Sequence, residues 1–207
     1  NEILNGSAIG WFQGRMEFGP RSLGARSIIA DAKSDKMQKN LNLKIKYRES
    51  FRPFAPAVLR EDLNKWFDLD KDSPYMSFVA KVKSDHLKND HKDNEIQTGL
   101  NQINFVRSEL PAITHVDYSA RIQTVHENQN KKFFKLLKKL KDKSNCSVIV
   151  NTSFNVRGEP IVNTPEDAFN CFMGTEMDIL VIGNCFLIKK EQNPNLKKDY
   201  KDKFDLD

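Results

Sequence analysis

Arginine side chains alternate with glycines near the start of the sequence. The segment GRMEFGPRSLGARS, residues 14–27, contains Arg15, Arg21 and Arg26 among Gly residues. Glycine lets backbone amides approach an anion closely, and a guanidinium binds phosphate or carboxylate through two parallel hydrogen bonds. The segment matches neither the P-loop pattern GxxxxGK[ST] nor the dinucleotide pattern GxGxxG. It predicts an anion-binding loop, and ordinary surface ion pairs are the alternative.

A second group of cations lies in KIKYRESFRPFAP, residues 44–56. Lys44, Lys46, Arg48 and Arg52 crowd the end of a predicted helix. Cations at this place also complement the helix dipole, so capping is the alternative explanation. Because four positive charges within nine residues exceed what a cap needs, we interpret this group as a phosphate-binding cluster.

Short polar side chains follow a predicted strand in VNTSFNVRGEP, residues 150–160. Asn151, Ser153 and Asn155 alternate with period two and would share one face, before a turn that contains Arg157. Ligands of open α/β sheets bind where strands end. A half-buried edge strand shows the same alternation, and that alternative remains open.

The segment HVDYSARIQTV, residues 115–125, adds Arg121 and the pair His115 and Asp117. No Ser or Cys nucleophile is paired with this His, so we expect it to be structural. Taken together, the cations and short polar side chains favour an anionic nucleotide substrate, with catalysis by positioning and charge rather than through a covalent step.

Several local patterns predict the elements that position these residues. Strands are expected at residues 8–12, 27–30, 56–59, 75–82 and 147–150, and a hairpin at 179–182 and 186–188. One helix is expected after Ser34 or Asp35, with Met37, Leu41 and Ile45 on one face, and another runs from Pro165 to Gly174 behind a Thr164 cap. This order predicts an α/β fold with a sheet of mixed direction.

The segment KKFFKLLKKLKDK, residues 131–143, predicts an amphipathic helix with Phe133, Leu136, Leu137 and Leu140 on one stripe. We interpret it as a surface helix that covers a sheet and keeps its lysines in water. An anionic membrane surface or a groove on a partner protein are the alternatives.

The composition is that of a folded protein. The 207 residues include 39% hydrophobic residues and 14 Phe, and the net charge is +5, which permits nucleic acid, a membrane surface or a phosphorylated small molecule as a partner. We expect one domain over residues 1–190, with a surface insertion at 84–102 and a polar, frayed tail at 191–207.

Targeting and metal-binding signals are missing from the sequence. No apolar run is long enough to span a membrane, and no signal peptide is visible. The three cysteines form no CxxC pair and the four histidines show no metal-ligand spacing, so we expect reduced thiols in a cytoplasmic protein without a metal site. The first residue is Asn rather than Met, which suggests a domain cut from a longer polypeptide.

Four segments together resemble the C-terminal domain of the NodU/CmcH/TobZ family of O-carbamoyltransferases. They are GRMEFGPRSLGARSIIAD, KYRESFRPFAPAVL, HVDYSARIQTV and NTSFNVRGEPIVNTPEDA. Their joint order, from about Gly10 to Gly174, is specific to this family. One departure is Tyr118, because a Gly usually stands at this place beside SAR. A bulkier residue there either narrows the pocket or points to solvent.

The resemblance implies a YrdC-like twisted sheet of mixed direction flanked by helices. It also implies that the domain binds ATP, with its Mg²⁺, and carbamoyl phosphate, and makes carbamoyl-adenylate. An N-terminal actin-like, metal-binding domain, absent from this sequence, then transfers the carbamoyl group to an acceptor hydroxyl.

The same resemblance places Arg21, Lys46, Arg121, Asn151 and Ser153 in the carbamoyl-adenylate pocket. Arg21, Lys46 and Arg121 are the predicted catalytic cations. Arg15, Arg26, Arg48, Arg52, Asn155 and Arg157 are further candidates for substrate binding. Two other functions are kept as alternatives. One is an RNA-binding module of the tRNA-modification type, although no RNP-type aromatic pair appears. The other is a non-catalytic partner domain.

Overall fold

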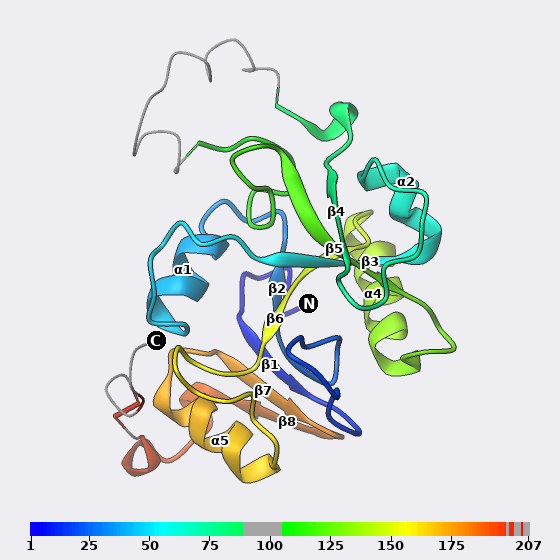
Figure 1. Ribbon diagram of the computed structural model, residues 1–207. Coiled ribbons are helices and arrows are strands. Elements are labelled where there is room, and N and C mark those ends of the chain that lie inside the picture. The colour runs from blue at the N-terminus through cyan, green and yellow to red at the C-terminus, as the bar shows by residue number, and fades with distance from the viewer. Residues whose placement is uncertain (89–104, 198, 201–203, 205–207) are drawn as a thin grey trace. The chain divides into compact units, whose positions relative to one another are not determined.

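Two units, each with paired strands of mixed direction, make up the computed structural model of the chain (Figure 1). The structure describes residues 1–88, 105–197, 199–200 and 204. The first unit comprises Asn1–Asp31, Lys39–Arg52 and Asn151–Asp207, and the second comprises Ala32–Gln38 and Pro53–Val150. The chain crosses from one unit to the other within strand β6 (Val148–Ser153) and within helix α1 (Met37–Lys44).

The first unit is built around strand β1 (Ile9–Phe12). β1 pairs antiparallel with β2 (Arg26–Asp31) and parallel with β7 (Ile179–Ile182), which pairs antiparallel with β8 (Cys185–Ile188). The short 3-10 helices η4 (Lys189–Glu191) and η5 (Pro194–Leu196) follow β8. The predicted strands at 8–12 and 27–30 and the predicted hairpin are therefore confirmed.

Helix α5 (Pro165–Gly174) packs on β1 and β7. Its start is a complete capping box, because the Thr164 side chain accepts from the Asp167 amide and the Asp167 side chain accepts from the Thr164 amide. Its buried face includes Ala168 and Phe172. The predicted cap, the Pro at the first helical position and the end at Gly174 are confirmed.

The ring of Phe154 lies so close to the backbone of Gly10 in β1 that only glycine fits there. A Cβ atom on Gly10 would lie 2.6 Å from the ring of Phe154, which is fully buried just after β6. Any larger residue would force this ring out of the core.

The second unit contains β3 (Ala55–Leu59), β4 (Phe78–Lys81) and β5 (Ser119–Val125). β5 pairs parallel with β3 and antiparallel with β4. The segments η1 (Arg60–Asp62), α2 (Leu63–Trp66) and η2 (Ser84–His86) lie between these strands along the chain. β5 falls in the segment 115–125, for which no strand was predicted from the sequence.

Helix α4 (Lys131–Ser144) packs against β3, so its predicted role as a cover for strands is confirmed. Asn130 caps its start, and Phe133, Leu137 and Leu140 are buried. Lys138 and Lys141 form ion pairs with Glu61 at 2.9 and 3.4 Å. Leu136, predicted on the apolar stripe, is half-buried.

Strands paired in both directions, with helices packed on them, confirm the predicted α/β class. The YrdC-like assignment stays a prediction. Of the insertion predicted at 84–102, only residues 84–88 fall within the described residues. Among the described residues, no helix is both long enough and apolar enough to cross a membrane.

One expectation about the tail is wrong. The tail was expected to be frayed after Lys190, but Tyr200 is 2% exposed and its hydroxyl donates to the carboxylate of Glu159. The polar composition of residues 191–207 hides a single buried aromatic anchor.

Candidate active site

Lys46 is a buried cation that is surrounded by oxygen atoms. Its Nζ donates to the carbonyl of Ser153 at 2.5 Å, the carbonyl of Asn155 at 2.9 Å and Oδ1 of Asn155 at 2.8 Å. An ammonium group has three donors, so all of them are directed at the segment that follows β6. Lys46 therefore joins the end of α1 to residues 153–155.

The chain direction after α1 explains how Lys46 becomes buried. The amide of Lys46 donates to the carbonyl of Leu41 at 2.9 Å, and the amide of Arg48 donates to the carbonyl of Asn42 at 3.1 Å. Tyr47 between them has φ 48°, in the left-handed region. This turn leaves Lys46 only 4% exposed.

The pKa of Lys46 is lowered from 10.5 to about 7, chiefly by burial and also by the neighbouring charge of Arg48. Glu159 opposes this effect and raises the pKa of Lys46. The pKa of Arg48 is itself lowered to about 10, chiefly by burial and also by Arg52. Two desolvated cations beside each other favour a bound anion, because an anion would stabilise both charges.

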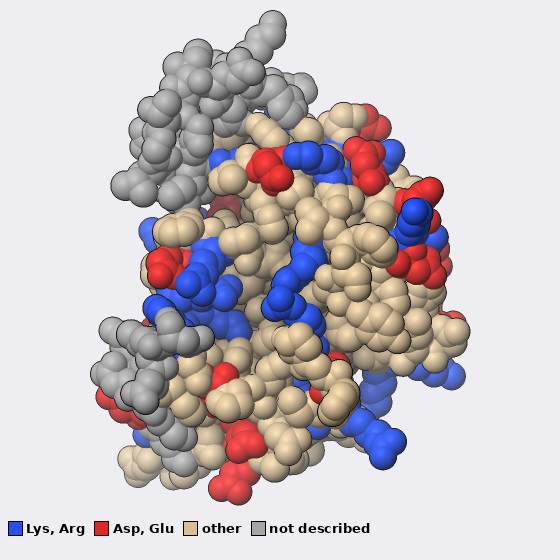
Figure 2. Space-filling model, in the orientation of Figure 1, with Lys and Arg blue, Asp and Glu red and all other residues tan. Residues whose placement is uncertain are grey.

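Buried Asn42 holds the other cations of this segment. Its Oδ1 accepts from Nε of Arg48 at 2.6 Å, and its Nδ2 donates to the carbonyls of Ser50 and Arg52 at 3.1 and 2.8 Å. Arg52 also pairs with Glu49 at 2.9 Å. Figure 2 shows Lys and Arg side chains gathered over the region of α1 and the loop after it.

Glu17 and Arg26 organise the glycine-rich loop at residues 14–27. Oε1 of Glu17 accepts from the amides of Leu23 and Ala25 at 2.6 and 2.7 Å. The guanidinium of Arg26 donates to the carbonyls of Gln13 and Gly14 and lies 3.5 Å from the centroid of the Phe12 ring. Arg26 therefore connects the ends of this loop.

Arg15 and Arg21 lie on the same loop and are exposed. Asn151 joins the loop to β6, because its Nδ2 donates to the carbonyl of Ser22 at 3.2 Å. Asn151 is 1% exposed. The first unit thus brings the glycine-rich loop, the segment after α1 and the segment after β6 together through Asn151 and Lys46.

Arg157 also belongs to this assembly, since its amide donates to the carbonyl of Lys46 at 3.3 Å. All the predicted site residues except Arg121 therefore lie in the first unit. The assignment of these side chains to substrate binding and catalysis stays a prediction.

Arg121 lies on β5 of the second unit, opposite Val79 of β4, and is half-buried. Before it, Asp117 accepts from the amide and hydroxyl of Ser119 at 3.1 and 2.6 Å. Burial lowers the pKa of His115, and the charge of Arg121 lowers it further.

Tyr118, the departure from the family pattern, has φ 64°. Glycine adopts this left-handed conformation without strain, which gives the usual Gly at this place a physical reason.

Three residues with clear structural roles were not selected from the sequence. They are Glu17, Asn42 and Glu159. For Glu17 a signal existed, because a lone carboxylate in a glycine-rich loop is suited to accept backbone amides. Asn42 and Glu159 gave no signal, since the carbonyl of Arg52 and the hydroxyl of Tyr200, which are among their partners, come near only through the fold.

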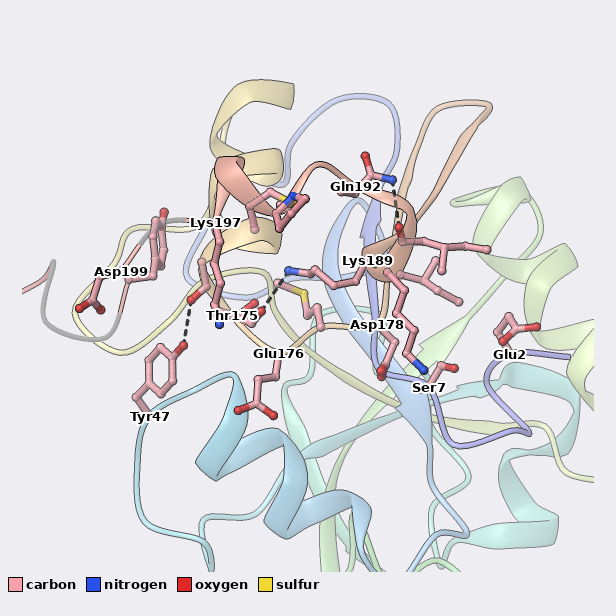
Figure 3. Close-up of a pocket in the computed structure, with 18 residues that line it drawn as sticks. Glu2, Ser7, Tyr47, Thr175, Glu176, Asp178, Lys189, Gln192, Lys197 and Asp199 are labelled. Carbon is pink, nitrogen blue, oxygen red and sulfur yellow. Dashed lines mark hydrogen bonds between the residues drawn. The ribbon is translucent and has the colours of Figure 1, made fainter.

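A cavity of about 1090 Å³ also lies in the first unit (Figure 3). Tyr47, Thr175 and the tail residues Lys197 and Tyr200 are among its lining residues, and side chains of both charges surround it. Lys189 donates to the carbonyls of Phe172 and, at 3.0 Å, Thr175, and burial lowers its pKa to about 8. None of the predicted site residues is among the described residues that line this cavity.

Comparison with known proteins assigns the family. Residues 1–190 match the family described as carbamoyltransferase C-terminus. The chain is 38% identical to the nodulation protein NolNO of Sinorhizobium fredii, over 93% of this chain and 26% of that protein. It is 34% identical to the 3'-hydroxymethylcephem-O-carbamoyltransferase of Streptomyces clavuligerus, over 88% of this chain and 30% of that protein.

An uncharacterized protein of Synechocystis sp. is 54% identical, over 99% of this chain and 34% of its own length. This chain therefore spans about a third or less of the length of these relatives. The resemblance predicted from the four sequence segments is confirmed: the chain belongs to the carbamoyltransferase C-terminus family.

Proposed function

We propose that this chain is the part of a carbamoyltransferase that activates a carbamoyl group with ATP. The observation that carries the proposal is the buried Lys46, which lies beside the desolvated Arg48 and binds the segment after β6. The family match and the similarity to the 3'-hydroxymethylcephem-O-carbamoyltransferase of Streptomyces clavuligerus support carbamoyl transfer as the reaction class.

The proposed chemistry consumes carbamoyl phosphate, water and ATP. Water cleaves carbamoyl phosphate to carbamate and inorganic phosphate. An oxygen of carbamate then attacks the α-phosphorus of ATP, and the bond from this phosphorus to the bridging β-phosphate oxygen breaks. The products are carbamoyl-adenylate and pyrophosphate, which takes the electron pair of the broken bond. ATP arrives as its Mg²⁺ complex, in which phosphates and water supply most ligands.

The loop cations are suited to the charge that this step moves. Arg15 and Arg21 are exposed on a loop whose backbone Glu17 and Arg26 hold in place. We assign to Arg21 the stabilisation of the leaving pyrophosphate. Preorganised cations stabilise developing negative charge without reorganising during the reaction. Arg121 of the second unit is proposed as a further cation for substrate phosphate.

Lys46 has a different assignment within the proposal. Because its three donors are directed at Ser153 and Asn155, it holds their segment and supplies a buried positive charge nearby. Asn151 and Ser153 are assigned to the carbamoyl group or its phosphate. Arg48, Arg52, Asn155 and Arg157 are proposed as supporting residues for the anion.

Transfer from the adenylate to an acceptor hydroxyl is proposed to require a further domain, because relatives of this chain are about three times as long. Among the described residues, no group of three His, Cys, Asp or Glu side chains is arranged for a metal ion.

We place the reaction in the cytoplasm. All three cysteines are described and no disulfide joins them, which suits a reducing compartment.

Pyrophosphate exchange tests the proposal directly. The 207-residue chain is expected to incorporate labelled pyrophosphate into ATP when carbamoyl phosphate is present, and to transfer no carbamoyl group to a hydroxyl acceptor. Arg21→Ala is expected to lower exchange about ten- to hundredfold. Lys139→Ala, which removes a 78% exposed lysine of α4, is the matched control. RNA binding with a steep salt dependence and no ATP binding would instead support a nucleic-acid module.

A further inference from the structure

Tyr200 anchors the C-terminal segment in the first unit. Its side chain is 2% exposed, and its hydroxyl donates to Oε1 of Glu159. Its Cβ lies only 2.3 Å from the place where a Cβ on Gly174 would stand, so the last residue of α5 leaves room for it. Its ring also lies edge to face with the ring of Phe204, and the two ring centroids are 5.3 Å apart. The space beside Gly174 and the hydrogen bond to Glu159 together fix the position of the Tyr200 side chain.

Glu159 connects Tyr200 to the segment after β6. While Oε1 accepts from Tyr200, Oε2 accepts from the amide of Val156 at 2.9 Å. The backbone carbonyl of Glu159 accepts from Nδ2 of Asn155 at 2.6 Å. Glu159 is 9% exposed, so the hydrogen bonds from Tyr200 and Val156 stabilise a carboxylate that has little contact with water.

Asn155 completes the connection to Lys46. Its Nδ2 is directed at Glu159, and this orientation leaves its Oδ1 to accept from Nζ of Lys46 at 2.8 Å. A continuous series of contacts therefore runs from Tyr200 through Glu159 and Asn155 to the buried ammonium of Lys46.

We propose that Tyr200 is a positioning residue: by holding Glu159, it keeps Asn155 and Lys46 in the arrangement that the substrate site needs. The inference rests on the proposed function, because that function makes Lys46 part of the site. Tyr200 must then be in its buried position for the site to be complete.

The position of the cavity fits this role. Gln192, Pro194, Lys197 and Tyr200 of the tail line this cavity together with Tyr47. Figure 3 labels Gln192, Lys197 and Tyr47 among its lining residues. Among the described residues of 191–200, Tyr200 is the one that is buried. Tyr47 follows Lys46 directly, and its hydroxyl donates to the carbonyl of Gly174 at 2.9 Å. Gly174 therefore contacts both Tyr200 and the residue beside Lys46.

The test is a double-mutant cycle on the 207-residue chain with Tyr200→Phe, Glu159→Gln and the double variant. ATP affinity is measured by calorimetry well below the melting temperature. Tyr200→Phe keeps the ring and removes the hydroxyl, so we expect the fold to persist and ATP to bind about three- to tenfold more weakly. The double variant is expected to bind no more weakly than Glu159→Gln alone, because both changes break one contact.

Two further variants separate positioning from stability. Gly174→Ala keeps Tyr200 but displaces it, and is expected to weaken ATP binding at least as much as Tyr200→Phe. Tyr75→Phe removes a hydroxyl from a 69% exposed tyrosine of the second unit and is the matched control. It is expected to leave ATP affinity unchanged.

A readout without ATP distinguishes the two possible failures. The Nζ signal of Lys46, followed by NMR in lysine labelled with ¹⁵N and assigned with Lys46→Arg, reports its titration. Tyr200→Phe is expected to move the midpoint of the Lys46 titration by about half a pH unit or more. If wild type fails to bind ATP, the proposed function is wrong, and the midpoint alone decides whether Tyr200 positions Lys46. If wild type binds ATP and Tyr200→Phe changes neither affinity nor midpoint, only the positioning role of Tyr200 is overturned.

Discussion

Nζ of Lys46 lies 2.8 Å from Oδ1 of Asn155, a residue 109 positions further along the chain. The contact ties the end of α1 to the segment after β6 and replaces water around a lysine that is 4% exposed. The same ammonium also donates to the carbonyls of Ser153 and Asn155. Lys46 is consequently a structural connection as well as a charge, and its removal has effects on both stability and binding.

The titration of Lys46 predicts a pH dependence of stability. Its pKa falls from 10.5 to about 7 on folding, so between these values the unfolded chain binds more protons than the folded one. The free energy of unfolding is therefore expected to rise with pH from about 7 to 9, by an amount on the order of a few kcal/mol. Below about pH 7 this contribution is absent.

Denaturant unfolding of wild type and Lys46→Met at several pH values measures this effect. The variant is expected to show a clearly smaller rise, because methionine does not titrate. Arg48, Glu159 and Cys171 also face Lys46, and all three residues are kept in both proteins. Equal slopes for the two proteins would mean that Lys46 is not the titrating group.

Arg121→Ala is expected to weaken the binding of ATP or carbamoyl phosphate about ten- to hundredfold without unfolding the protein. A charge-assisted hydrogen bond to phosphate contributes about 1.5–3 kcal/mol, and Arg121 is only half-buried on β5. Calorimetric titration beside a melting curve measures both effects, with Lys139→Ala as the control. A lowered melting temperature with intact affinity would make Arg121 a structural residue of β5.

Gly10→Ala is expected to destabilise the first unit by about 1–3 kcal/mol, because the added methyl group would meet the ring of Phe154 at 2.6 Å. The double variant Gly10→Ala/Phe154→Leu gives the methyl group room, so it is expected to lose less stability than the sum of its single changes. Chemical denaturation of the four proteins checks this. Strict additivity would show that Gly10 and Phe154 do not pack together.

Thr164→Ala is expected to lower the free energy of unfolding by about 1 kcal/mol, because it removes the acceptor for the amide of Asp167 at the start of α5. Thr164→Ser keeps an oxygen at the same place and is expected to retain most of the stability. Thermal melting distinguishes them. If both variants melt like wild type, the capping box contributes nothing measurable to α5.

Elements that depend on near neighbours could be predicted from the sequence. Thr164, Pro165 and Gly174 mark both ends of α5, and the apolar stripe of residues 131–143 predicts α4 with its buried side. The segments that carry the family resemblance could also be recognised, because motif order is a property of the chain itself.

The sequence alone thus determined the α/β class, helices α4 and α5, the Thr164 cap of α5, the β7–β8 hairpin and the family. The tertiary structure decided which charges are desolvated and what holds them. The partners of Lys46 lie 107 and 109 positions away, and Glu159 lies 41 positions from Tyr200. Helix and strand periods report only local order, whereas burial and pKa depend on which distant segments pack together. For the same reason, a polar tail concealed a buried anchor at Tyr200.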